Sequence, residues 1–380
     1  MAGTIVVAGL SARALAESAG RAGWDVIALD LFGDADTRRA ARRWYSIGDP
    51  ADCAIDPALL RAALHRAASQ SADLLGWVAG SGFEGIPEAL DIEVPRLPLL
   101  GMTASSVRRV REPESFFATL DRLGLPHPEV SLRPPTNALG WLAKSAAGSG
   151  GWHIRPAAGF SGGGAAVYWQ RIQPGAPMSA LFLADGTRAR LVALNRLIVQ
   201  PLGALPYVYF GAVGPIRDAA LAQQVQILLD ALVPAFGLRG LASLDFLVDD
   251  GTAWLLEINP RPSGTMVLHD AAWPGGLLHA HLQALKGELP GGPPTHPADV
   301  RGYRTVHAGQ DAQVGPALAA QLAHSPHCHD LPAPGARFGR GEPVCSVSAE
   351  AASSEAVLAA LDAAAARILH RLSPCEELVP

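Results

Sequence analysis

The chain has 380 residues, 49% hydrophobic and 17% charged, a composition typical of globular rather than disordered proteins. Its length exceeds one ordinary core and indicates two or three domains. The net charge of −5 gives no reason to expect nucleic acid or an anionic membrane as a partner. The four cysteines are widely spaced and form no C-x-x-C pair, and the first residues lack a basic leader or a membrane-length apolar run, so we expect a cytoplasmic protein.

The N-terminal part reads as alternating strands and helices. A β-rich run at Thr4–Gly9 is followed by an alanine-rich helical stretch at Ala12–Ala22 and a second strand at Val26–Asp30. This β-α-β order predicts a parallel sheet. A later strand at Leu74–Val78 leads into the glycine-rich loop Gly80–Gly85, which either contacts a ligand or only makes a turn that requires glycine.

Further along the chain, helices and strands again alternate. Glu114–Leu123 is expected to be helical, and Gly140–Lys144 is expected to be a strand that leads into a loop with Gly148, Ser149, Gly150 and Gly151. A long amphipathic helix is predicted at Asp218–Phe236. From residue 300 onward we expect short strands and a final alanine-rich helix at Ser354–Leu372.

A carboxylate-bearing hairpin is the most informative local feature. Two apolar runs are joined by Asp249-Asp250-Gly251-Thr252, a turn-forming sequence, and Asp245 lies twelve residues before Glu257. Glu257 and Asn259 are two apart and share one strand face. Both carboxylates could be exposed hairpin residues, but in apolar strands unpaired carboxylates are costly, which favours a cation site. Oxygen ligands of this kind suit Mg²⁺.

Three features occur in an order that suits phosphate chemistry: a lysine on a strand, a glycine-rich loop directly after it, and the carboxylate hairpin about a hundred residues later. A lysine alone is usually a solvated side chain, but next to such a loop Lys144 is expected to contact phosphate. Glycines let backbone N–H groups approach phosphate oxygens closely. Together these features predict a site for phosphoryl transfer with Mg²⁺.

With this order and the sequence Glu257-Ile258-Asn259-Pro260-Arg261, the chain resembles the ATP-grasp superfamily of carboxylate–amine ligases, over about residues 106–290. The resemblance implies an α/β (α+β) fold: a small N-terminal parallel α/β domain (1–105) and a two-lobed ATP-grasp unit, with a small lobe (106–175) and a large lobe carrying the Mg²⁺ site (176–290). A small β-rich C-terminal extension (291–380) with a final helix would follow. The stretch Pro290–Pro294 supports the last boundary by its composition.

The resemblance also implies residue roles. ATP phosphates would contact Lys144, Arg111 and the loop of Gly148, Ser149, Gly150 and Gly151, and adenine would meet the backbone of Gln170, Arg171 and Ile172. Mg²⁺, with Mn²⁺ as an alternative, would bind Asp245 and Glu257, with Asn259 on a second ion. Arg261 would steady the acyl phosphate or the transferred phosphoryl group, and Lys144 would help to orient the γ-phosphate. Arg196 would contact phosphate or a substrate carboxylate, unless it is an ordinary surface arginine.

The sequence departs from the superfamily at two positions. The lysine common near the start of the first lobe is replaced by the run Arg108–Arg111, so an arginine, here Arg111, would have to serve. A glutamate that often follows the hinge glycine and holds the ribose is absent, because Gly175 is followed by Ala176-Pro177.

A narrower resemblance rests on Ser179–Phe182, Asn195-Arg196 and Tyr209–Gly211, and on the tail segments Asp330–Gly335 and Gly341–Val347. These segments resemble the sequences of a subgroup of predicted ATP-grasp carboligases related to biotin carboxylase. Some members join glutamate to tyramine in the synthesis of methanofuran-type cofactors. The resemblance therefore implies amide formation through an acyl phosphate from small-molecule carboxylate and amine substrates, and a homodimer is one expected assembly.

Two other functions stay open, namely a bicarbonate-activating carboxylase-type enzyme and a nucleotide-binding regulator without turnover. The cluster of His324, His327, Cys328, His329 and Asp330 matches no zinc-finger spacing and is interpreted as a loop with chance histidines rather than a zinc site.

Overall fold

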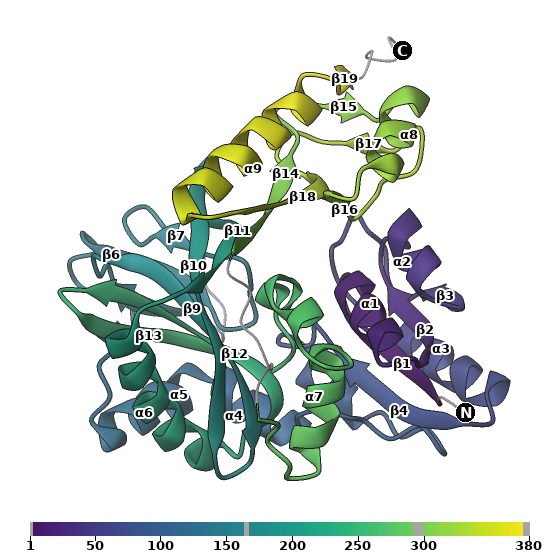
Figure 1. The fold of residues 1–380 in the computed structure, drawn as a ribbon. Coiled ribbons are helices and arrows are strands. Elements are labelled where there is room, and N and C mark those ends of the chain that lie inside the picture. Colours follow the sequence, from purple (N-terminus) through teal and green to yellow (C-terminus); the bar gives the residue numbers. More distant parts are fainter. Residues whose placement is uncertain (1–2, 163–166, 292–298, 375–380) are drawn as a thin grey trace.

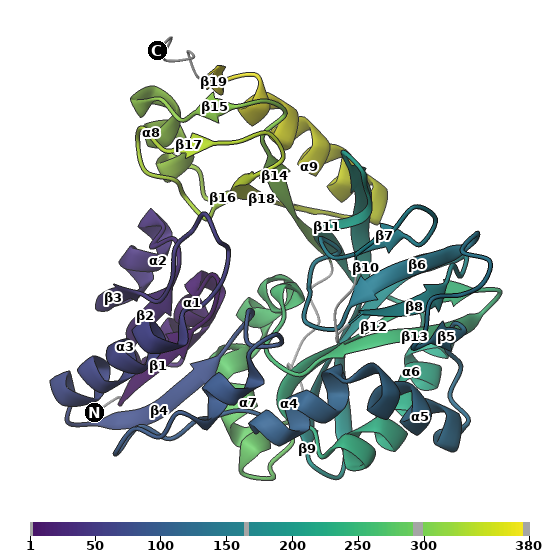
Figure 2. The same cartoon turned by 180° about the vertical axis from the view of Figure 1, so that it is seen from behind.

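The structure is a computed structural model that describes residues 3–162, 167–291 and 299–374 (Figure 1). Most of the predicted boundary at Pro290–Pro294 lies outside the described residues, and the domain limits stay predictions. An N-terminal sheet lies on one side, a large antiparallel sheet with a small lobe lies on the other, and the C-terminal segment meets both (Figures 1 and 2). The predicted α/β class is confirmed.

The N-terminal sheet is fully parallel, in the order β3-β2-β1-β4. Its strands are β1 (Thr4–Ala8), β2 (Asp25–Asp30), β3 (Arg43–Ser46) and β4 (Leu74–Ala79), and its helices are α1 (Arg13–Arg21), α2 (Ala35–Ala40) and α3 (Pro57–Gln70). Asp56 caps α3 by accepting from the backbone N–H groups of Ala58 and Leu59. The predicted β-α-β opening is confirmed; the sequence analysis did not predict β3 or α2.

The small lobe follows the short helix η1 (Pro87–Asp91). Its sheet has the order β5-β8-β6-β7. The elements are α4 (Ala104–Arg111), α5 (Pro113–Leu123), β5 (Val130–Ser131), β6 (Trp141–Ser145), β7 (Arg155–Pro156) and β8 (Val167–Arg171). Helix α5 begins at a proline and ends at Gly124, which adopts the left-handed conformation that suits glycine after a helix. The predicted strand that carries Lys144 is confirmed as β6.

The large sheet is antiparallel and has the order β13-β12-β9-β10-β11-β14-β18-β16. Its strands are β9 (Ala176–Asp185), β10 (Ala189–Leu202), β11 (Leu205–Ile216), β12 (Arg239–Asp249), β13 (Thr252–Asn259), β14 (Val300–His307), β16 (Cys328–His329) and β18 (Pro343–Ala351). Because β14 pairs with β11, the C-terminal residues extend the sheet of the large lobe rather than standing apart from it.

Helices cover both faces of this sheet. One face packs against α6 (Ala219–Phe236), and the other packs against α7 (Gly276–Leu285). Two short helices, η2 (Gly264–Leu268) and η3 (Asp270–Ala272), precede α7 in the chain. Helix α6 is long and apolar enough to cross a membrane by length and composition alone. Its buried residues, such as Val225 and Leu229, instead belong to the core beneath the sheet, as in many globular proteins.

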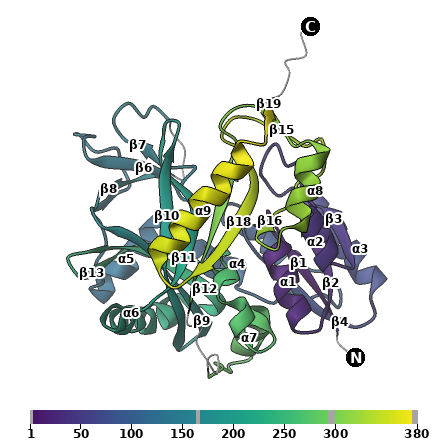
Figure 3. The ribbon, with the colours of Figure 1, turned by 45° about the horizontal axis from the view of Figure 1, so that its top comes forward.

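The C-terminal segment closes the structure. Helix α9 (Ser354–Leu369) lies across β14 and β18, as Figure 3 shows. A three-stranded sheet and one further helix complete this segment, with β15 (Ala312–Gln313), β17 (Arg337–Phe338), β19 (Ser373–Pro374) and α8 (Pro316–His324).

Candidate active site

The carboxylate hairpin forms as predicted. Strands β12 and β13 pair so that Asp245 faces Glu257, and the turn residues Asp250 and Gly251 both have positive φ, as a two-residue hairpin turn requires. The Asn259 amide donates to the Asp245 carboxylate, with Nδ2 3.0 Å from Oδ2. The structure therefore brings the three predicted metal ligands together, and their binding of Mg²⁺ stays a prediction.

A polar row continues from this hairpin across the sheet. Glu257, Asp245, Ser179 and Asn195 face one another in register on the adjacent strands β13, β12, β9 and β10, and so lie on one face. Ser179 and Asn195 are buried, and Asn195 Oδ1 lies 2.7 Å from His269 Nε2. The sequence analysis quoted Ser179 and Asn195 only for the family resemblance and missed that they extend the row of carboxylates.

The two carboxylates titrate differently. Burial and the neighbouring Glu257 charge raise the pKa of Asp245 above its ordinary range. Burial also opposes ionisation of Glu257, but the positive charges of Arg111 and Lys144 outweigh it and lower that pKa. Glu257 is therefore the more firmly ionised of the pair, and a divalent cation would favour ionisation of both.

Arg111 ends helix α4 and connects three parts of the site. Its Nη1 lies 3.1 Å from Glu257 Oε2, and its Nη2 donates to the backbone carbonyls of Ala146 (2.8 Å) and Gly148 (2.7 Å). These carbonyls belong to the glycine-rich segment after β6. The arginine therefore holds both that segment and a predicted metal ligand, and its replacement of a phosphate-binding lysine stays a prediction.

Lys144 is buried, with 4% of its surface exposed. Its one hydrogen bond to a described residue is to a neutral group, from Nζ to Gln170 Oε1 at 3.2 Å. Gln170 is equally buried, and its Nε2 has no hydrogen-bond partner among the described residues. A buried ammonium with a neutral partner and an unpaired amide donor are both costly, so an anion bound between them would be stabilised.

The glycine-rich loop packs against β11. The backbone N–H of Tyr209 donates to the carbonyl of Gly150 at 2.9 Å. Gly151 has φ +78°, and a Cβ there would overlap the Tyr207 carbonyl oxygen, so only glycine fits this approach. The loop therefore lies over the site in a defined position, between Lys144 and β11.

Arg261 follows the hairpin and is oriented by three groups. Its Nε donates to Glu84 Oε1 at 2.6 Å, its Nη1 to the Pro262 carbonyl and its Nη2 to Asn259 Oδ1. Glu84 is buried, and Arg261 and Arg111 outweigh that burial and lower its pKa. Glu84 lies in the loop Gly80–Gly85, so this loop reaches the site; its role as the arginine's partner was missed, because the two residues are 177 positions apart.

A pair of tyrosines lies beside these groups. The hydroxyls of Tyr209 on β11 and Tyr303 on β14 are hydrogen-bonded to each other. Burial raises the pKa of Tyr303 to about 12, and the pKa of Tyr209 is also raised, chiefly by burial, with Asp245 contributing. Both phenols are therefore neutral around pH 7 and can donate hydrogen bonds.

The remaining predicted residues lie at the margins of the site. Gln170 and Arg171 end β8, and the Ile172 N–H donates to the Gly140 carbonyl, so the proposed adenine contact lies at the exit from the small lobe. Arg196 is exposed, and its side chain forms no hydrogen bond or ion pair with a described residue. It pairs in register with Met178, on the face opposite Asn195. The structure does not bring Arg196 to the polar row, and its role stays a prediction.

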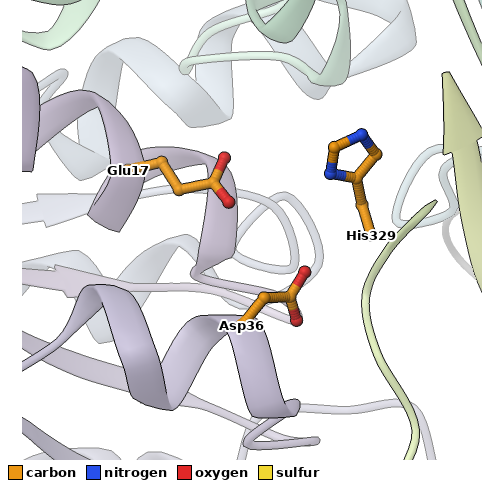
Figure 4. A group of neighbouring side chains, drawn as sticks. All are labelled: Glu17, Asp36 and His329. Atoms are coloured by element: carbon orange, nitrogen blue, oxygen red, sulfur yellow. The ribbon is translucent and has the colours of Figure 1, made fainter. Parts of the chain in front are cut away.

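A second charged cluster joins the N-terminal and C-terminal parts of the chain. Glu17, Asp36 and His329 form a group of three side chains whose possible metal-ligand atoms all lie within 4.8 Å of one another. Among the described residues it is the one such group of three or more His, Cys, Asp or Glu side chains, and its members point toward a common centre (Figure 4). Arg13 already pairs with this group and lies 2.7 Å from Asp330. The Asp36 carboxylate accepts the backbone N–H groups of residues 330 and 331. These contacts favour a clamp between the two parts over a metal site.

Three comparisons place this geometry among known proteins. Residues 114–265 match the ATP-grasp domain family. Over 193 residues the chain is 26% identical to the carbamoyl phosphate synthase large chain of Deinococcus radiodurans; the match covers 44% of this chain and 19% of that enzyme.

Solved structures match over nearly the whole chain. N5-carboxyaminoimidazole ribonucleotide synthetase from Thermus thermophilus is 17% identical with a TM-score of 0.66, covering 99% of this chain and 100% of that one. Biotin carboxylase from Campylobacter jejuni is 13% identical with a TM-score of 0.70, covering 98% and 92%. At these identities the likeness concerns the fold. The chain therefore contains an ATP-grasp domain at residues 114–265, within a fold that it shares with these two enzymes.

Proposed function

We propose that the chain is an ATP-dependent ligase that activates a carboxylate as an acyl phosphate and transfers the acyl group to an amine. The observation that carries the proposal is the buried Lys144, whose hydrogen-bond partner among the described residues is a neutral amide. It lies near Arg111 and Glu257, and the Glu257 carboxylate faces Asp245. Cations that hold phosphate, and carboxylates that hold Mg²⁺, are the parts that phosphoryl transfer needs.

The donor set of Asp245, Glu257 and Asn259 fits a hard divalent cation, because all three offer oxygen and two offer charge. Mg²⁺, when bound, neutralises phosphate charge; Mn²⁺ is an alternative with similar preferences. Lys144 and Arg111 bind and orient the phosphates, and the loop Gly148–Gly151 excludes water from them.

The reaction then needs no protein nucleophile. A substrate carboxylate oxygen attacks the γ-phosphorus, the bond to the β-phosphate oxygen breaks, and ADP leaves. The amine nitrogen attacks the carbonyl carbon of the acyl phosphate, loses a proton, and displaces inorganic phosphate to leave an amide. Arg261, held by Glu84 and Asn259, is placed to stabilise the negative charge on the acyl phosphate.

Within this class we propose glutamate and an aromatic amine such as tyramine as the first substrates to test, in the synthesis of a methanofuran-type cofactor. The support for this pair is the sequence resemblance alone. We propose a homodimer on the same resemblance, and a cytoplasmic location on the wide spacing of the cysteines.

The test measures ADP release with Mg²⁺ across a panel of carboxylates and amines, and separately with bicarbonate. ADP release that requires both a carboxylate and an amine supports the ligase, and release that requires bicarbonate identifies the carboxylase-type alternative. Glu257→Gln should abolish either activity. A wild-type chain that binds nucleotide but releases no ADP under any of these conditions would refute the ligase and favour the regulator.

A further inference from the structure

His153 lies just after the glycine-rich loop and takes no part in the functions argued so far. Its imidazole packs directly on Gly148, where a Cβ would overlap the ring. Its Nδ1 is buried and forms no hydrogen bond of ordinary geometry with a described residue, although the backbone of Ser149 interacts weakly with the ring. A glycine therefore makes room for a ring whose polar atom is removed from water and unpaired, an arrangement that costs stability unless a ligand uses it.

The charged neighbours of His153 are those of the phosphate site. The imidazole interacts electrostatically with Glu257, Lys144 and Arg111. Burial, with further effects of Lys144 and Arg111, lowers the pKa of His153 to about 4. The ring is therefore neutral around pH 7, with one nitrogen that donates and one that accepts.

We propose that His153 is a nucleotide-binding residue, whose free Nδ1 donates a hydrogen bond to a phosphate oxygen of bound ATP. The inference rests on the proposed function, since it places ATP in this site. Phosphate is the expected partner because Lys144 and Arg111 are the cations beside the ring, whereas the proposed adenine contact lies at Gln170–Ile172. The unpaired Nε2 of Gln170, which shares Lys144 as a neighbour, is a second buried polar atom without a protein partner here.

His307 supplies a matched control within the same chain. Its Nδ1 is also buried and unpaired, and burial also lowers its pKa to about 4. Its ring lies 4.5 Å from that of Phe210 and 5.9 Å from that of Trp152, and the charge that acts on it is Arg304 rather than Glu257, Lys144 or Arg111.

The experiment compares Mg·ATP binding by calorimetry in wild type, His153→Ala, His153→Asn and His307→Asn, together with the melting temperature of each ligand-free protein. Asparagine places an amide N–H near the position of Nδ1 and so keeps the hydrogen bond. We expect His153→Ala to weaken Mg·ATP binding about tenfold or more, as loss of a hydrogen bond to a charged group does. His153→Asn should stay within about threefold of wild type, and His307→Asn within about twofold.

Two results would overturn the inference while leaving the proposed function intact: Mg·ATP binding by His153→Ala within about twofold of wild type, or binding by His153→Asn as weak as that by His153→Ala. Either would mean that the ring only packs on Gly148. If His153→Ala melts too early for calorimetry, His153→Phe takes its place with the same expected loss, because phenylalanine keeps a ring on Gly148 and removes both nitrogens. A wild-type chain that binds no Mg·ATP would overturn the proposed function and this inference together.

Discussion

Glu84→Gln removes one negative charge while nearly keeping the shape of the side chain, and it tests how Arg261 is held. The Glu84 and Arg261 side chains are 3% and 14% exposed and lie 2.6 Å apart. The other Glu84 oxygen accepts the N–H of Gly82 at 2.8 Å. Glutamine has one oxygen and can accept from only one of these two donors. The variant therefore leaves the buried guanidinium without its counter-charge, and the other donor faces the N–H group of the glutamine amide.

The expected loss follows from that geometry. Breaking a buried ion pair by removing one partner costs about 3–5 kcal/mol. Because glutamine keeps one hydrogen bond, we expect about 3 kcal/mol of lost unfolding free energy, at the lower end of that range. Turnover should fall roughly 10- to 100-fold, since a displaced Arg261 no longer meets the acyl phosphate at the right distance.

The assay is urea denaturation combined with ADP release. The control is Glu350→Gln, because Glu350 pairs with Arg301 at 3.0 Å on the surface of β14 and β18, with side chains 44% and 27% exposed. An exposed pair is worth at most about 1 kcal/mol. The double variant Glu84→Leu/Arg261→Met should regain most of the lost stability yet stay inactive, since neither charge of this pair is left without the other.

Equal losses for Glu84→Gln and Glu350→Gln would refute the reasoning, because burial would then not strengthen the pair. A double variant less stable than Glu84→Gln would also refute it. If Glu84→Gln is destabilised but its turnover is unchanged, the ion pair stabilises the fold but is not needed to position Arg261.

Three further predictions test other parts of the structure. Arg111→Met should lose about 50-fold or more in Mg·ATP binding by calorimetry, and Arg111→Lys should lose less, because lysine keeps the charge for phosphate but loses the fork that holds the carbonyls of Ala146 and Gly148; equal losses would contradict this. Gly151→Ala should weaken Mg·ATP binding about tenfold by displacing the loop, whereas Gly203→Ala, also at positive φ but with nothing within 4 Å, should not. His281 is buried, and burial lowers its pKa to about 4, so protonation favours the unfolded state. The stability that the neutral His281 contributes is complete above pH about 6.5 and is lost as the pH falls toward 4. His281→Gln should remove about 3 kcal/mol of that pH dependence in urea titrations, and an unchanged slope would refute this.

Local patterns in the sequence predicted the parts of the site that depend on neighbouring residues. The turn at Asp250-Gly251 predicted the hairpin and its first residue pairs, from Asp249 with Thr252 to Phe246 with Leu255. An irregularity between Asp245 and Phe246 then shifts the register by one residue and places Asp245 opposite Glu257, which the turn alone does not determine. Lys144 on a strand before a glycine-rich loop was found in the same way. Both predictions concern contacts within one supersecondary unit, whose geometry short sequences determine.

Contacts between distant segments were not predictable from one sequence. Helix α4 was missed because its sequence is polar apart from Ala104, Val107 and Val110, which are buried in the packed structure. The pairing of β14 with β11 and the contact of Glu84 with Arg261 depend on how whole elements assemble. Edge strand β3 was missed because its four residues lack a fully buried face.

Arg111 shows why metal and nucleotide should bind cooperatively. Its Nη1 pairs with Glu257, while its Nη2 donates to the backbone carbonyls of Ala146 and Gly148. A cation bound to Glu257 alone would lie near the guanidinium, and the repulsion would oppose it. A triphosphate supplies the anion that Arg111 loses, so the nucleotide should tighten Mg²⁺ binding and Mg²⁺ should tighten nucleotide binding by the same factor. Calorimetric titration of each ligand with and without the other measures this factor, and we expect it to be smaller in Arg111→Met, where only the direct attraction between Mg²⁺ and phosphate remains. An equal factor in wild type and Arg111→Met would show that the ion pair does not couple the two sites.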